Sequence, residues 1–398
     1  MTLATGVGSM PGDDNRAYAE AVRLTLGELP DLAFVPELPG RGVTANMTGR
    51  ALAIVDGLGV DLQPAGWRLT DAPGIDHRRA RSLLAQDLDQ VEEQAQGHGG
   101  PFKTQVCGPW TLAATVEKPR GDKILSDHGA RRDLAQALAE GVRDHVADLR
   151  RRLPGTERLV VQVDEPALPA VLGGQVPTAS GFGRHRRVDL PEASAALEWV
   201  LAAITEAGAE PWVHSCAPGV PWSLVHGAGA LGLSADLDVL RPEDLDHFAE
   251  VIEAGQTVAL GIVPSTDPAS VLGDVALTER VLRWLDMLGL DHEEGRGQVG
   301  PPGPDPQQGV LLLLQIDAAG YLRRQGRTVG AAMGDGDLGG RQAFFAGDGL
   351  HPDPGATCGI IDDFHLGQGL AITLRRPVLC QGDSGGDSAG KKFVASFR

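Results

Sequence analysis

The chain has 398 residues and a formal net charge of −18 at pH 7, with 42% hydrophobic and 22% charged residues. A phosphate backbone would repel this charge, which argues against general binding of nucleic acid. The hydrophobic content predicts a soluble globular protein whose core needs no disulfide bonds.

The cysteines and the apolar runs bear on where the protein is found. Four cysteines are scattered along the chain: Cys107, Cys216, Cys358 and Cys380. This is not the pattern of a disulfide framework, and it favours a reducing, cytoplasmic setting. Residues 1–12 lack the basic start and apolar run of a signal peptide. The longest strongly apolar stretch, residues 310–314, is too short to cross a bilayer, so we expect no membrane association.

Short β-like runs alternate with helical patterns up to about residue 291. In the clearest helical pattern, apolar residues recur at helical spacing from Leu134 to Leu149. Strands that alternate with helices predict a parallel sheet, here a (β/α)₈ barrel over residues 1–291, with a doubly wound open sheet as the alternative. The strand candidates are Ala4–Ser9, Ala33–Glu37, Lys103–Cys107, Leu159–Asp164, Pro211–Cys216, Ala230–Leu237 and Thr257–Val263.

The composition changes after residue 291. Residues 292–398 contain 22 of the 54 glycines, and proline-rich and Gly-Asp-rich runs crowd the segment. Such a composition is typical of loops or disorder. We therefore expect an irregular tail over residues 292–398 that does not supply the eighth βα unit of the barrel. A shifted reading frame in the coding DNA would account for it.

A His-x-Cys motif ends one of the predicted strands, in Trp212-Val-His214-Ser-Cys216. Residues i and i+2 of a strand point the same way, so an imidazole and a thiolate can face one point. That is half of a zinc site, and Asp236 at the end of the next strand is a plausible third ligand. A buried cysteine beside a chance histidine is the alternative interpretation.

Paired carboxylates end another predicted strand, in Val161-Gln-Val-Asp164-Glu165-Pro166. An unpaired buried charge is costly, so these side chains are unlike packing residues. Asp164 and Glu165 are the candidate catalytic pair, able to bind an ammonium group or to move a proton. A solvated strand end is the alternative.

Five sequence motifs resemble those of the catalytic half of the cobalamin-independent methionine synthase family, and they stand in the family's order along the chain. Two are the motifs above: the Asp-Glu pair, and the His-x-Cys that follows it by some fifty residues. The other three are Gly6-Val-Gly8-Ser9-Met-Pro11, Phe34-Val-Pro-Glu37 and Val106-Cys-Gly108-Pro109-Trp-Thr111. The resemblance covers about 290 residues and implies the barrel fold.

The resemblance implies that a zinc ion binds the thiol of homocysteine and lowers its pKa, so that a thiolate exists at neutral pH. The thiolate would take the methyl group of 5-methyltetrahydrofolate and form methionine. A methylated corrinoid protein is the alternative methyl donor, because the resemblance lacks the N-terminal half of the family. A metal-free relative of uroporphyrinogen decarboxylase, which shares the barrel, is the rival activity.

The roles of individual residues follow from their motif positions. His214 and Cys216 would bind zinc, with Asp236 near the place of a Glu ligand of the family. Ser9, Glu37 and Asp164 would hold the amino-acid end of homocysteine. The methyl donor would contact Gly108, Pro109 and Thr111.

One expected ligand is missing from the sequence. The family has a further zinc-binding cysteine in a Pro-x-Cys-Gly-Leu motif at the eighth strand, and residues 300–308 hold no cysteine in its place. Cys358 is the nearest substitute, some fifty residues later. Without that ligand the chain would bind zinc weakly, and a non-catalytic remnant that only binds an amino acid is a further hypothesis.

Overall fold

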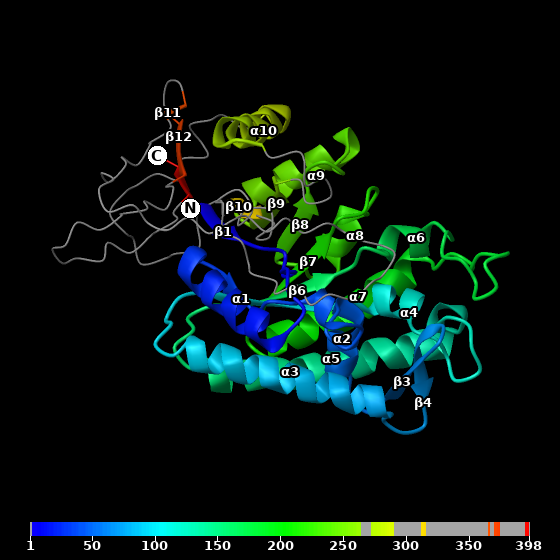
Figure 1. The fold of residues 1–398 in the computed structure, drawn as a ribbon. Coiled ribbons are helices and arrows are strands. Elements are labelled where there is room, and N and C mark those ends of the chain that lie inside the picture. The colour runs from blue at the N-terminus through cyan, green and yellow to red at the C-terminus, as the bar shows by residue number, and fades with distance from the viewer. Residues whose placement is uncertain are drawn as a thin grey trace, which may run out of the picture.

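A computed structural model describes residues 2–263 and 272–289 and four short strand segments of the C-terminal region. Its main feature is a curled, all-parallel sheet of eight strands in the order β1-β10-β9-β8-β7-β6-β5-β2, with helices around its outer side (Figure 1). The order follows the chain around the sheet and lacks the reversal of a doubly wound sheet. The fold is therefore α/β and similar to a TIM barrel, as the alternation of strands and helices predicted.

All seven strands expected from the sequence are present. The register between β5 and β6 runs from Phe102 opposite Leu159 to Cys107 opposite Asp164, so the ends of these neighbours are level. The strands of the sheet are β1 (Thr2–Thr5), β2 (Ala33–Phe34), β5 (Phe102–Cys107), β6 (Leu159–Asp164), β7 (Glu210–Ser215), β8 (Gly232–Asp236), β9 (Thr257–Gly261) and β10 (Leu312–Gln315).

The eighth strand comes from a part of the chain where none was expected. Strand β10 pairs in parallel with β9 on one side and with β1 on the other. It therefore takes the place of an eighth barrel strand, which corrects the strand part of the expectation that residues after 291 do not supply the eighth βα unit. The residues on either side of β10 lie outside the described part. The described pieces β11 (His365–Leu366), β12 (Leu370–Leu374) and β13 (Ala395–Phe397) form a separate antiparallel sheet.

The barrel is not closed by a continuous ladder. Strands β1 and β2 are the two ends of the sheet, and a parallel bridge between Ser9 and Glu37 joins the segments that follow them. The backbone N–H of Met10 donates to the carbonyl of Glu37 at 2.7 Å, and the N–H of Glu37 donates to Gly8 at 2.9 Å. The seam between the two ends is thus held beside residues expected to bind substrate.

Several helices begin at residues that suit a helix N-terminus. The side chains of Asp14, Asn46 and Asp127 accept hydrogen bonds from the first turns of α1, α2 and α5. The helices are α1 (Asn15–Glu28), α2 (Met47–Ile54), α3 (Ile75–Gln94), α4 (Pro109–Thr115), α5 (His128–Arg152), α6 (Leu168–Leu172), α7 (Leu190–Glu206), α8 (Trp222–Gly227), α9 (Pro242–Glu253) and α10 (Asp274–Met287), with 3₁₀ turns at Pro39–Arg41 and Ile124–Ser126. Within the described part, no helix is long and apolar enough to span a membrane.

An antiparallel hairpin after α2, β3 (Gly59–Gln63) with β4 (Gly66–Thr70), was not predicted. Its sequence carries the signal of a hairpin, because Val60 and Leu62 alternate with polar residues in one strand, as do Trp67 and Leu69 in the other. An ion pair of 2.5 Å between Arg68 and the buried Glu117 ties the hairpin to the loop after α4.

Close packing of α5 against the end of α2 requires a glycine at position 141. A Cβ atom there would overlap the carbonyl oxygen of Ile54, a backbone atom that cannot move alone. In α1, a Cβ atom at Gly27 would meet nothing within 4 Å. The two helical glycines form a matched pair.

We expect Gly141→Ala to lower the free energy of unfolding by about 1–3 kcal/mol, because the new methyl group overpacks the interface. Gly27→Ala should instead raise it, by up to about 1 kcal/mol, because alanine is the better helix former. Urea unfolding of both variants checks the packing of α5. Equal stabilisation by the two substitutions would contradict it.

Candidate active site

The expected site residues gather at one edge of the sheet. Because the strands are parallel, their carboxyl ends meet there, as in barrel enzymes. Glu37 follows β2, Asp164 ends β6, and Glu165 comes directly after it. His214 lies near the end of β7, directly opposite Asp164 in the register.

Glu37 is buried beside the seam. Its carboxylate lies 3.5 Å from Nε of Arg50, and its side chain is 5% exposed. Burial raises the pKa of Glu37, while the positive charges of Arg50 and Lys103 and a hydrogen bond with Gln105 oppose the rise. Ser9, its bridge partner, is exposed.

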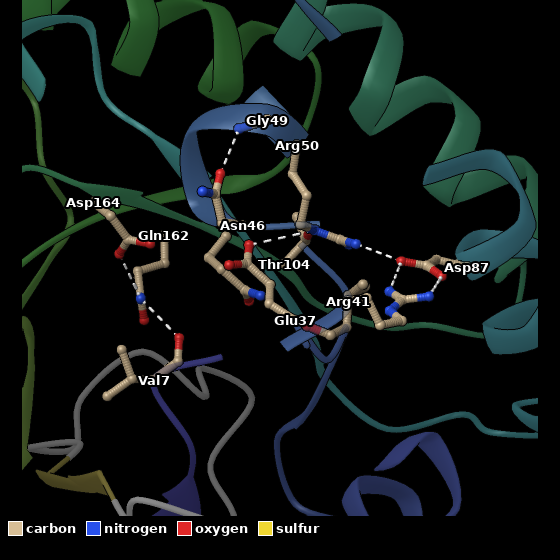
Figure 2. Close-up of polar contacts among 12 residues, drawn as sticks. Val7, Glu37, Arg41, Asn46, Gly49, Arg50, Asp87, Thr104, Gln162 and Asp164 are labelled. Carbon is tan, nitrogen blue, oxygen red and sulfur yellow. Dashed lines mark hydrogen bonds and ion pairs between the residues drawn. The ribbon is translucent and has the colours of Figure 1, made fainter. Parts of the chain in front are cut away.

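A buried network of charged side chains surrounds Arg50, the ion-pair partner of Glu37 (Figure 2). Arg50 also donates to Asp87 at 2.5 Å, and Arg41 makes a two-pronged contact with the same carboxylate at 2.8 and 2.7 Å. The guanidinium of Arg41 lies over the Tyr18 ring, 4.5 Å from its centroid. These contacts join α1, α2 and α3 to the site and hold Arg50 in place.

Asp164 is the second buried carboxylate. Its Oδ1 accepts a hydrogen bond of 2.7 Å from the Gln162 amide (Figure 2). Burial raises its pKa to about 8, with the charge of Glu37 as the next contribution in the same direction. Because the charge of Glu37 adds to this rise, a cationic ligand beside Asp164 would stabilise its ionised form.

Glu165, the other half of the expected catalytic pair, faces a helix. Its two carboxylate oxygens accept from the backbone N–H groups of Trp110 and Thr111 at 2.8 and 2.9 Å, and from the Thr111 hydroxyl at 2.7 Å. The side chain is fully buried. These bonds anchor the first turn of α4, where a carboxylate is favoured. Burial raises the pKa of Glu165 to about 7, although the same hydrogen bonds oppose the rise.

The turn expected to bind the methyl donor is buried with Glu165. Gly108, Pro109 and Thr111 are all buried. A Cβ atom at Gly108 would overlap the Glu165 carboxylate, so only glycine fits this close approach. The Gly108 N–H donates to the carbonyl of Asp164, and Thr111 contacts Glu165 and Ala167; the contact of the turn with a methyl donor stays a prediction.

One ring nitrogen of His214 has a hydrogen-bond partner. Its Nδ1 lies 2.8 Å from the Ser234 hydroxyl, and burial lowers its pKa to about 4, with the charge of Lys103 adding to the effect. The ring is therefore neutral at pH 7. A neutral ring whose Nδ1 has a partner can offer Nε2 to a ligand or metal.

The other two expected zinc ligands are less buried. Cys216 is an exposed residue, but its thiol is partly buried, and this burial raises the pKa of the thiol above its ordinary value. The Asp236 carboxylate accepts from the backbone N–H of Asp238 at 2.9 Å. Across residues 2–263 and 272–289, no group of three or more His, Cys, Asp or Glu side chains is placed to hold a metal ion. Within these ranges His214, Cys216 and Asp236 therefore do not form such a group, although the charge of Asp236 acts on the Cys216 thiol and raises its pKa.

Sequence reasoning missed the basic partners of the carboxylates. Lys103 is fully buried on β5, and Arg50 is buried on α2. A lysine inside a strand otherwise suited to the barrel interior was an available signal for the first. No local signal marked Arg50, because its partners Glu37 and Asp87 are distant in the sequence.

Comparisons with known proteins give no family for the chain. No family model and no curated protein matches it. Among solved structures, it is similar to a B12-independent methionine synthase from Shewanella sp. W3-18-1, with 14% identity, coverage of 78% of this chain and 83% of that one, and a TM-score of 0.47. It is also similar to a GH5_18 protein from Streptomyces cattleya (15% identity, 83% and 82% coverage, TM-score 0.39) and to a 2,3-dimethylmalate lyase (12%, 81% and 79%, 0.33). Each TM-score is below 0.5, and none of these likenesses identifies a family or an activity.

We expect Glu165→Gln to lower the free energy of unfolding by about 1–3 kcal/mol, because an amide has one oxygen for three donors. The deficit should shrink as the pH rises from 4.5 to about 7. A carboxyl whose pKa is higher in the folded state stabilises the wild type most at low pH and loses that contribution through this window. Urea unfolding at several pH values measures it, with the exposed Glu140→Gln as control. A deficit that grows with pH would contradict the role of Glu165.

The described geometry also predicts how zinc binding, if the full chain binds zinc, depends on these side chains. The double variant His214→Ala, Cys216→Ala should lose the bound metal, since it removes both expected donors. Asp236→Asn should keep it, because Asp236 is not grouped with them. Metal analysis after dialysis against a chelator measures both. Full zinc retention in the double variant, or loss in Asp236→Asn, would contradict this arrangement.

Proposed function

We propose that this chain is a methyltransferase that acts on the thiol of homocysteine or of a similar amino acid. The observation that carries the proposal is the pair of buried carboxylates, Glu37 and Asp164, at the carboxyl edge of a barrel-like sheet. The motifs that resemble cobalamin-independent methionine synthase supply the reaction. The structural likenesses add nothing to it, because their TM-scores are too low.

The amino-acid end of the substrate would bind at the carboxylates. A substrate ammonium group beside Glu37 and Asp164 would favour the ionised form of both acids, whose pKa burial raises. Hydrogen bonds from an ammonium to carboxylates are charge-assisted and therefore strong. The exposed Ser9 hydroxyl, next to Glu37 across the seam, is suited to the substrate carboxylate.

The thiol end would extend towards β7. The neutral His214 ring and the Cys216 thiol lie at the end of that strand. Zinc remains part of the proposal as a cofactor that would stabilise a substrate thiolate, but it would need a donor from outside the described ranges, such as Cys358. Because the described donors do not complete a zinc site, we route no step through the metal.

The methyl donor is proposed from the sequence motif. The Gly108-Pro109-x-Thr111 turn favours 5-methyltetrahydrofolate, and a methylated corrinoid protein is the alternative. Parallel assays of methyl transfer from each donor distinguish them.

A second candidate function has an observation of its own. A protein that binds an amino acid without turning it over would need the carboxylates and no metal. The incomplete donor set around His214 favours this candidate. Binding without turnover by the full chain would support it over the methyltransferase.

The proposal is tested by the formation of methionine from homocysteine and 5-methyltetrahydrofolate with added zinc. Asp164→Asn and Glu37→Gln should each raise KM for homocysteine by about 10- to 100-fold, because each removes one charge-assisted hydrogen bond to the ammonium group. Asp133→Asn, on the exposed face of α5, is the matched control. Unchanged kinetics in both site variants, or no binding of any amino acid thiol by the wild type, would overturn it.

A further inference from the structure

We propose that Lys103 is a positioning residue that acts through Gln162 to set the orientation of Asp164 for the substrate ammonium group. The inference rests on the proposed function in its choice of ligand, and it adds a residue that the sequence motifs did not single out. Lys103 would not touch the substrate.

The contacts form a short chain of hydrogen bonds. The Lys103 ammonium donates to Oε1 of Gln162 at 3.0 Å and to the carbonyl of Val7 at 3.1 Å. Nε2 of the same Gln162 donates to Oδ1 of Asp164 at 2.7 Å and to Val7 at 3.0 Å (Figure 2). Each end of the Gln162 amide therefore faces groups of the opposite hydrogen-bonding type.

This arrangement fixes which way the amide points. An ammonium group can only donate, and Oδ1 of Asp164 accepts from Nε2, so these two contacts dictate the orientation of the amide between them. With Nε2 bound to Oδ1, the carboxylate of Asp164 is held on one side. Loss of the ammonium would leave Oε1 of Gln162 buried without this donor, and the constraint on Asp164 would weaken.

Lys103 is also a counter-charge. It is fully buried, and the charges of Asp164 and Glu37 support its ionised form against the effect of burial. Arg50 supplies a second positive charge at Glu37. The other titratable groups around this point are the neutral His214 on β7, Glu165 after β6, and the thiols of Cys107 and Cys216. Removal of Lys103 would leave Asp164 with the repulsion of Glu37 and without its nearby cation.

A purely structural role for Lys103 predicts a different pattern of effects. A buried cation whose loss only loosens the barrel would weaken every ligand alike. A positioning role weakens only ligands that carry the ammonium group, and only while Asp164 is a carboxylate. L-homocysteine and 4-mercaptobutanoate, its analogue without the amino group, separate these two cases.

The experiment is a double-mutant cycle on the full chain with Lys103→Met, Asp164→Asn and the double variant, with ligand affinities from calorimetry. Lys103→Met should weaken binding of L-homocysteine by about tenfold and change that of 4-mercaptobutanoate by less than about twofold. In the Asp164→Asn background the same substitution should have no further effect. Gln162→Met, which breaks the chain of hydrogen bonds but keeps the ammonium, should reproduce the selective loss, and it serves as the test if Lys103→Met does not fold.

Equal weakening of both ligands, or additive effects in the cycle, would overturn the positioning role. If the wild type binds neither ligand, the proposed function fails, and the crystal structure of Lys103→Met then decides on Lys103. An altered Gln162 amide and Asp164 carboxylate in that structure would support the role independently of the ligand. Unchanged positions of both side chains would overturn it.

Discussion

Three carboxyl groups are buried side by side at the carboxyl edge of the sheet, and each would be costly without compensation. Asp164 has Gln162 and Lys103, Glu37 has Arg50, and Glu165 has the first turn of α4. Arg41 and Asp87 hold Arg50 in place, and the glycine at position 108 leaves room for the Glu165 carboxylate. Much of the polar interior follows from the need to stabilise these acids.

The order of elements could be predicted from the sequence because it depends on local patterns. The run Leu159–Asp164 gave strand β6 with its exact bounds, and the apolar spacing from Leu134 to Leu149 gave α5. Strand β10 was missed because its apolar run stands in a segment rich in glycine and proline, where composition predicted no strand. Its pairing depends on the distant strands β1 and β9.

The sequence motifs predicted where the site residues lie better than they predicted what each side chain contacts. Motifs placed Glu37, Asp164 and His214 correctly at one edge, because strand ends are visible in sequence. They could not show that Glu165 turns towards α4 or that His214, Cys216 and Asp236 form no three-residue metal-binding group in the described ranges. Both depend on side-chain directions that the fold decides, and the spacing of residues along the chain does not contain them.

The seam between β1 and β2 gives the site a mechanical property. The edges of the sheet are joined beside Ser9 and Glu37, two side chains proposed to hold one ligand. A molecule that contacts both side chains would link the two edges of the sheet. Its binding would therefore stabilise the joined form of the seam. Ligand binding should therefore reduce local opening of the seam. The backbone amides of Met10 and Glu37, which make the hydrogen bonds across it, should then exchange hydrogen more slowly.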